Sequence, residues 1–171
     1  MQEPIDLRNA REEDLPFFFS LYSDVRGPEM SGWGWPAAQR ESFLRMQFEA
    51  QRRSWQAAYP NTADRVVCLG DLPIGRILTA HTQHGTHLID IALLGEFRSR
   101  GIGAWLLRQL MTDCERSHSA LSLQVLNGNP ARRLYLRLGF RDTDAGEMYI
   151  HMRWTPEFSR DTETSAGVRA S

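Results

Sequence analysis

The chain has 171 residues, of which 42% are hydrophobic and 24% charged, and its formal net charge is -1. These values are those of one soluble globular domain with a sizeable core, and they argue against a strongly basic nucleic-acid or membrane-surface binder. All twenty basic residues are arginine, so Schiff-base chemistry on a lysine is excluded.

The N-terminal third of the chain predicts one strand and two helices. Residues 5–10 alternate apolar and polar side chains, which is typical of a strand. Residues 11–22 begin with acidic side chains, as helices do. A loop rich in glycine, proline and tryptophan follows over 26–36, and residues 37–59 have the apolar spacing of a long amphipathic helix.

Short strands separated by turn signals dominate the rest of the chain. The expected elements are strands over 64–70, 72–80 and 85–94, a helix over 101–117, a strand over 120–126, a helix over 129–138, and strands over 139–144 and 147–154. This order predicts a mixed α/β fold, with helices on both faces of one sheet. We expect a single domain over residues 1–155 and a polar, flexible tail over 156–171.

Cysteine usage and the N-terminus bear on the cellular location. Cys68 and Cys114 are too few for a disulfide framework and lack metal-ligand spacing, and their apolar neighbours predict buried free thiols. The first residues are acidic and lack the apolar core of a signal peptide, and no apolar run reaches the ~20 residues of a spanning helix. We therefore expect a cytoplasmic protein with no membrane anchor and no metal site.

Two arginines and two glycines are concentrated between a predicted strand and a predicted helix, at residues 98–103. A Rossmann fingerprint would need glycine at Leu106, and a P-loop would need a lysine, so neither matches. A helix N-terminus offers unpaired N–H groups, and glycines let an anion approach them. The segment is therefore either an anion site or a plain turn with surface arginines.

Two motifs resemble the GNAT N-acetyltransferase superfamily. The stretch "LLGEFRSRGIGAWLL" is similar to its motif A, Arg/Gln-x-x-Gly-x-Gly/Ala, on Arg98, Gly101 and Gly103. "NPARRLYLRLGF" resembles its second conserved block, on Asn129, Ala131, Tyr135, Gly139 and Phe140. The resemblance implies a GNAT-like fold, with a mostly antiparallel sheet of about seven strands that splays between the fourth and fifth strands and about four helices.

The same resemblance implies acetyl-CoA as the co-substrate. Its pyrophosphate would lie on the amides of residues 98–103, and its pantetheine would pair with main chain near Leu93, in the gap between strands 86–94 and 120–126. Gly95 stands where many relatives have proline, which loosens the turn. The cofactor-binding residues implied are Ala92, Leu93, Leu94, Arg98, Ser99, Arg100, Gly101, Ile102, Gly103, Asn127, Asn129, Arg132 and Tyr135.

Direct attack of an amine on the thioester needs a proton acceptor and a donor to the leaving thiolate. Tyr135 is the general acid that the resemblance implies, and the alternative is a half-buried packing tyrosine. Asp90 is the first choice of base, because it is an acid inside an apolar strand. His87 is the second choice and lies on the opposite face unless a bulge intervenes, and His151 is the third. Some relatives use a glutamate where this chain has Gln124, which cannot act as a base.

The acceptor would lie under the loop between the first two helices. Trp33 and Trp35 could wall a pocket there and Glu29 could attract an amine, or the tryptophans could cap the core. Polyamines, aminoglycosides, amino acids and protein N-termini all stay open as acceptors.

The sequence thus predicts an acetyl-CoA-dependent N-acetyltransferase acting on a small-molecule or peptide amine. The alternatives are a non-catalytic acyl-CoA-binding module and, with little support from the charge balance, a nucleic-acid module. Two copies could pair through the terminal strands as a homodimer.

Overall fold

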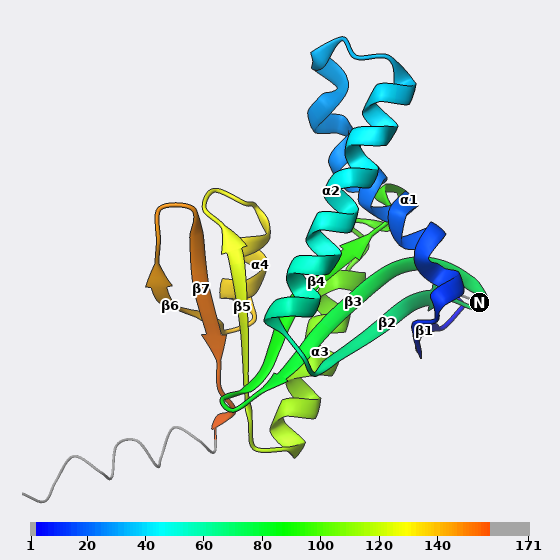
Figure 1. The fold of residues 1–171 in the computed structure, drawn as a ribbon. Coiled ribbons are helices and arrows are strands. Elements are labelled where there is room, and N and C mark those ends of the chain that lie inside the picture. Colours follow the sequence, from blue (N-terminus) through cyan, green and yellow to red (C-terminus); the bar gives the residue numbers. More distant parts are fainter. Residues whose placement is uncertain (1–2, 158–171) are drawn as a thin grey trace, which may run out of the picture. The chain divides into compact units, whose positions relative to one another are not determined.

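The computed structural model describes residues 3–157, so the predicted tail beyond residue 157 lies outside the described residues. Within them the chain forms seven strands and four α-helices (Figure 1). The strands are β1 (Ile5–Asn9), β2 (Thr62–Leu69), β3 (Leu72–Thr82), β4 (Gly85–Leu93), β5 (Ala120–Leu126), β6 (Arg141–Ala145) and β7 (Tyr149–Trp154). The helices are α1 (Leu15–Arg26), α2 (Ala37–Ala58), α3 (Ile102–Arg116) and α4 (Ala131–Arg137).

The strands form one mixed sheet with the order β1-β2-β3-β4-β5-β7-β6. The β4–β5 pair is parallel, with Gly85 opposite Ala120 and Leu88 opposite Leu123, whereas β1–β2, β2–β3, β5–β7 and β6–β7 are antiparallel. Gly85 is required at the start of β4, because a Cβ there would lie 2.3 Å from the Ala120 carbonyl oxygen. The predicted mixed α/β fold is confirmed.

The described residues fall into two compact units. Unit 1 contains the chain up to residue 80 and residues 89–102, and unit 2 contains residues 81–88 and the chain from residue 103 onward. The boundary between the units therefore falls inside β4 and again at the first turn of α3. The prediction of a single domain over residues 1–155 stays a prediction.

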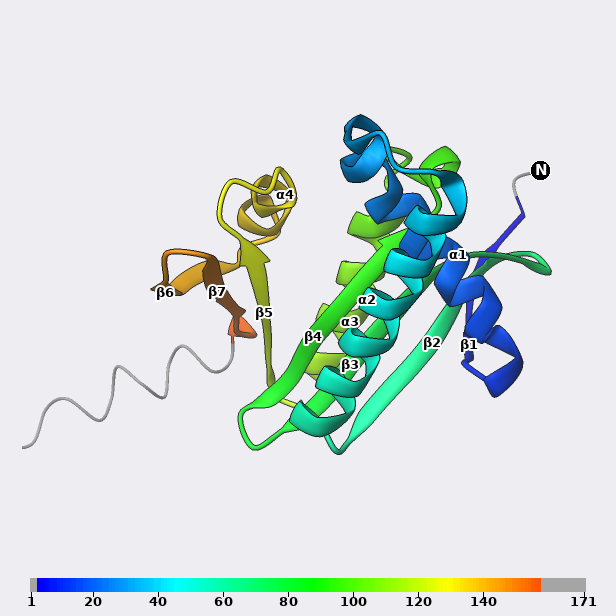
Figure 2. The same ribbon diagram turned by 45° about the horizontal axis from the view of Figure 1, so that its top comes forward.

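In unit 1, α1 and α2 lie side by side over one face of β2 and β3 (Figures 1 and 2). Their apolar stripes meet the sheet in a cluster of Phe18, Phe48, Val66 and Cys68. The Phe19 and Phe48 rings pack edge to face with centroids 5.6 Å apart, an arrangement that stabilises aromatic pairs.

In unit 2, the apolar residues of β5 alternate with polar ones, and Leu121, Leu123 and Val125 are buried. Leu106 and Leu107 of α3 are buried as well. The free thiol of Cys114 is also buried, as is that of Cys68 in unit 1, so the prediction for both cysteines is confirmed.

The first two predicted helices differ from the structure at their connection. A 3-10 turn over Glu12–Asp14 precedes α1, which runs on to Arg26 instead of ending at residue 22. The predicted loop 26–36 is largely a second 3-10 helix, Gly27–Trp33. Its i→i+3 bonds leave no 3.6-residue apolar period, so the sequence pattern contained no helical signal there.

Candidate functional site

The turn between β4 and α3 has the backbone of an anion cradle. Ser99 and Gly101 have φ values of 59° and 80°, both in the left-handed region, and α3 begins at Ile102. The first N–H groups of a helix have no partner within it. A Cβ built at Gly101 or Gly103 would meet no atom within 4 Å, so open space lies in front of both residues. The turn therefore fits a bound phosphate group.

The two arginines of this turn have partners in unit 1. Arg98 donates from Nε to the Leu93 carbonyl oxygen at 2.8 Å and from Nη2 to Asp24 Oδ2 at 2.7 Å. The Arg100 guanidinium lies 5.5 Å from the centre of the Phe97 ring. Arg98 thus ties its own turn to neighbouring elements, a role that the sequence did not reveal.

The main chain at the end of β4 is partly paired. The Leu94 amide donates to the Ile74 carbonyl oxygen at 2.9 Å, and the Leu93 carbonyl oxygen accepts the Arg98 bond. A Cβ at Gly75 would come within 2.5 Å of the Ala92 carbonyl oxygen, so β3 approaches β4 very closely there. The Leu94 N–H is therefore already committed to β3 and cannot be counted as an open donor.

Asp90 of β4 is half-buried beside a buried arginine. Burial raises the pKa of the Asp90 carboxyl to about 6, against the opposing effect of the Arg76 charge. Arg76 is held by Asp64 through Nε–Oδ1 and Nη2–Oδ2 bonds of 2.9 and 2.6 Å. Its guanidinium also stacks over Phe18 and Trp55.

A row of polar side chains in unit 2 contains the two histidine candidates. His87 Nδ1 lies 2.9 Å from Ser122 Oγ, and Gln124 Nε2 lies 3.2 Å from His151 Nδ1. Burial, with a smaller contribution from His151, lowers the pKa of the half-buried His87 imidazole. His87 is therefore neutral at pH 7.

Helix α4 carries the predicted general acid. Tyr135 is 8% exposed, and its ring packs edge to face on Phe140 with centroids 5.8 Å apart. Asn129 Oδ1 accepts the Ala131 amide at 2.9 Å and so satisfies an N–H group of the first turn of α4. Arg132 forms an ion pair with Asp142.

Two further predicted residues have main-chain or charged partners. The Asn127 amide donates to the Met148 carbonyl oxygen at 2.9 Å. Glu29, at the connection between α1 and α2, forms an ion pair with Arg26 at 3.5 Å.

The two tryptophans of this connection pack on each other and on Phe43 of α2. Ring centroids are 5.1 Å apart for Trp33 and Trp35, 5.9 Å for Trp33 and Phe43, and 5.4 Å for Trp35 and Phe43. Trp33 remains 49% exposed. These aromatic rings form a cluster of their own and are not part of the buried cluster around Phe48.

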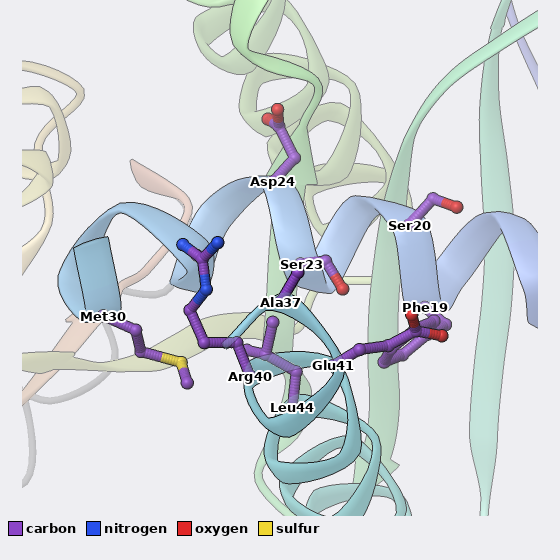
Figure 3. A pocket seen from close by; sticks show the side chains of 10 residues that line it. Phe19, Ser20, Ser23, Asp24, Met30, Ala37, Arg40, Glu41 and Leu44 are labelled. Carbon is purple, nitrogen blue, oxygen red and sulfur yellow. The ribbon is translucent and has the colours of Figure 1, made fainter. Parts of the chain in front are cut away.

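A cavity of about 550 Å³ lies between α1 and α2 (Figure 3). Its wall combines apolar side chains with charged and hydroxyl groups: Phe19, Ser20, Ser23, Asp24, Gly27, Met30, Ala37, Arg40, Glu41 and Leu44. Arg40 Nε and Ser23 Oγ are buried and have no hydrogen-bond partner among residues 3–157. None of the residues predicted from the sequence lines this cavity.

The described part of the chain contains no cluster of three metal-ligating side chains. No helix among residues 3–157 is long and apolar enough to cross a bilayer.

The sheet, with its parallel β4–β5 pair and a glycine turn before α3, defines a mixed α/β protein. The profile of the Acetyltransferase (GNAT) family matches residues 11–140, and the chain belongs to this family. It is therefore an acyltransferase of a family that uses acetyl-CoA. No curated protein sequence matches the chain.

Solved structures of acetyltransferases share this fold. The PaiA N-acetyltransferase from Thermoplasma acidophilum, in complex with coenzyme A, has a TM-score of 0.69 at 18% identity over 90% of this chain and 99% of its own. An acetyltransferase from Thermus thermophilus has a TM-score of 0.66 at 17% identity over 91% and 100%. The ribosomal-protein-S18-alanine N-acetyltransferase from Escherichia coli has a TM-score of 0.60 at 19% identity over 89% and 94%.

Proposed function

We propose that this acyltransferase moves an acetyl group from acetyl-CoA to a primary amine by direct attack. The observation that carries the proposal is the half-buried Asp90 carboxyl, whose pKa is raised to about 6. A base with a pKa near the working pH is ionised and still accepts protons well. Bound acetyl-CoA supplies the carbonyl carbon that is attacked and the thiolate that leaves.

The turn at residues 98–103 binds the diphosphate of the co-substrate in this proposal. Open space before Gly101 and Gly103, together with the first-turn N–H groups of α3, which have no partner within the helix, supports this role. The main chain around Ala92 and Leu93, at the end of β4, aligns the pantetheine arm.

Asp90 accepts a proton from the incoming ammonium group, directly or through water. An alkylamine has a pKa of ~10, so most of it is protonated at pH 7 and cannot attack. The ionised Asp90 carboxylate attracts this cation and takes up its proton. A main-chain amide of β4 before Leu94 then stabilises the charge that develops on the carbonyl oxygen, since the Leu94 N–H is already bound to Ile74.

Tyr135 donates a proton to the departing thiolate. A tyrosine hydroxyl keeps its proton at pH 7, because its pKa is ~10, and a thiol of pKa ~8.5 takes a proton at that pH. Asn127 and Asn129 lie between β5 and the same helix, Arg132 lies in its first turn, and all three belong to the co-substrate side of the proposal.

The acceptor is a small-molecule or peptide amine that enters beside the aromatic cluster of Trp33, Trp35 and Phe43. The exposed face of Trp33 suits an alkylammonium group, and Glu29 adds negative charge nearby.

We place the protein in the cytoplasm. Its edge strand β6, exposed along its whole length, is where two copies would pair as a homodimer.

The test is release of free CoA thiol from acetyl-CoA with a panel of polyamines, aminoglycosides, amino acids and peptides. Transfer to at least one amine, confirmed as an acetylated product by mass spectrometry, is the expected result. Saturable CoA binding without transfer to any amine would contradict the proposal and favour a non-catalytic acyl-CoA-binding module.

A pair of substitutions at Gly103 tests the diphosphate site separately. Gly103→Val fills the open space before the amides, so CoA affinity should fall at least tenfold. Gly103→Ala is the matched control, since the family motif allows alanine there, and it should bind CoA within about threefold of wild type. Equal affinity of all three proteins in calorimetry would remove the turn from the binding site.

A further inference from the structure

Asp24, near the end of α1, holds the segment between β4 and α3. Its Oδ2 atom accepts the Gly95 amide at 2.8 Å and the Arg98 Nη2 bond at 2.7 Å. These partners are 71 and 74 residues further along the chain. In Figure 3 the Asp24 side chain leaves α1 on the side away from Leu44 and Glu41, at the rim of the cavity.

The contact extends from Asp24 through Arg98 to the last residue of β4. Arg98 Nε donates to the Leu93 carbonyl oxygen at 2.8 Å, while its Nη2 atom binds Asp24. One carboxylate thus fixes the backbone at Gly95 and, through Arg98, the strand end at Leu93. The turn that begins at Arg98 includes two left-handed backbone positions, Ser99 and Gly101. L side chains rarely adopt this conformation.

Gly95 is a position where such a contact can hold the backbone. Proline would fix φ there by its own ring. Glycine leaves the turn loose, but it provides an N–H group that proline lacks, and this N–H is the one that binds Asp24. A Cβ at residue 95 would lie 3.4 Å from Asp24 Oδ2, so the carboxylate sits directly against the glycine.

We propose that Asp24 is a positioning residue, which holds the Gly95–Arg98 segment so that the turn at 98–103 is preformed for the diphosphate of acetyl-CoA. The inference rests on the proposed diphosphate site. Electrostatic repulsion alone would make this carboxylate hinder an anion, so any benefit to binding must come from geometry. The Asp24 and Arg98 side chains are 41% and 43% exposed, and such exposed pairs stabilise a fold very little.

Charge and geometry predict opposite signs for Asp24→Ala, which makes this variant the decisive test. If Asp24 positions the turn, the dissociation constant for CoA in calorimetry should rise about tenfold. The KM for acetyl-CoA should rise in parallel while kcat stays within about twofold. Acetyl-pantetheine, which lacks the diphosphate, should react with an unchanged kcat/KM.

Control variants separate positioning from charge and from folding. Glu41→Ala removes an equal charge from the same cavity at a residue that pairs with Arg45, and it should bind CoA no more weakly than wild type. Asp24→Asn keeps the side-chain volume and an acceptor for the Gly95 amide, and it should weaken CoA binding by a smaller factor. If Asp24→Ala does not fold, this variant carries the test.

A double substitution checks the Gly95 contact directly. Gly95→Pro places ring atoms where the N–H points at Asp24, so CoA binding should weaken. Adding Asp24→Ala to Gly95→Pro removes the clash but not the loss of the Arg98 contact, so CoA affinity should recover no further than that of Asp24→Ala alone. Equal or tighter CoA binding by Asp24→Ala than by wild type would overturn the inference and leave the proposed function intact. A wild-type protein that binds no CoA would instead overturn the proposed function.

Discussion

Two carboxylates of unit 1, Asp14 and Asp90, have pKa values that are shifted in opposite directions. Asp14 lies at the corner between β1 and α1, where hydrogen bonds from Arg8 lower its pKa to about 2. Asp90 lies in β4, where burial raises its pKa to about 6. An arginine is near both groups, so the presence of a cation does not explain the difference.

The difference lies in which carboxylate receives the arginine's hydrogen bonds. Arg8 donates to both oxygens of Asp14, at 2.7 and 2.8 Å, and the Arg11 amide adds a third bond of 2.8 Å. Near Asp90, the guanidinium of Arg76 is bound by Asp64 instead. Asp90 therefore experiences only the partly neutralised charge of Arg76, and burial outweighs it.

The comparison separates a carboxylate that stabilises the fold from one that the fold tolerates. Asp14 is more stable ionised in the folded state, so its charge strengthens the corner of β1 and α1. Asp90 is less stable ionised in the folded state, so its charge weakens the protein at neutral pH. A destabilising group of this kind is typical of a site selected for chemistry.

The largest expected effect is on turnover by Asp90→Asn. An amide cannot accept the proton, so kcat/KM with the best amine should fall about 10²–10⁴-fold, while CoA affinity is unchanged. In the wild type, kcat/KM should rise with pH through about 6, because the base must be ionised. Asp71→Asn, at an exposed turn, is the matched control. Turnover within threefold of wild type for Asp90→Asn would remove this residue from the mechanism.

The next effect is on stability, and here the same substitution should help. The raised pKa means that ionised Asp90 destabilises the folded state at pH 7, and the shift from 3.8 to about 6 corresponds to up to about 3 kcal/mol. Asp90→Asn should therefore unfold at higher urea concentration at pH 7. The difference should shrink as pH falls from 6 to 4, where the wild-type carboxyl is protonated. A destabilised Asp90→Asn protein would contradict the comparison.

Asp14→Asn should have the opposite sign and a smaller size. The lowered pKa gives a contribution that is present above about pH 4 and is lost as pH falls toward 2. Because Arg8 is partly exposed to solvent, we expect a loss of roughly 1–2 kcal/mol at pH 7. Urea unfolding at pH 7 and pH 3 measures it, and the gap between variant and wild type should narrow at the lower pH.

Most of the fold could be predicted from the sequence, because its elements have strong local patterns. The amphipathic period over α2 and the alternation along β5 matched the structure closely. The 3-10 helix at Gly27–Trp33 could not be recognised, since glycine, proline and tryptophan there follow no apolar period.

The candidate site residues that the sequence offers are conspicuous within their own segments, as an acid in an apolar strand or as glycines and arginines before a helix. Asp90 was noticed because it is an acid among apolar residues of a strand. Asp24 lies among other polar residues at the end of α1, and its partners are more than 70 residues away. The Asp64–Arg76 pair joins two strands whose register is fixed only on folding.

The smallest expected effect is that of the competing base, His87→Gln. The amide of glutamine can replace the imidazole as a partner for Ser122 Oγ, which lies 2.9 Å from His87 Nδ1. If Asp90 is the base, kcat/KM should change less than about threefold, and the rise near pH 6 should remain. Burial lowers the pKa of His87, so a histidine base would also make kcat/KM rise with pH on the acidic side of neutrality. The base is therefore identified by comparing the two variants: Asp90→Asn should lose kcat/KM, whereas His87→Gln should keep it. The reverse result would identify His87 as the base.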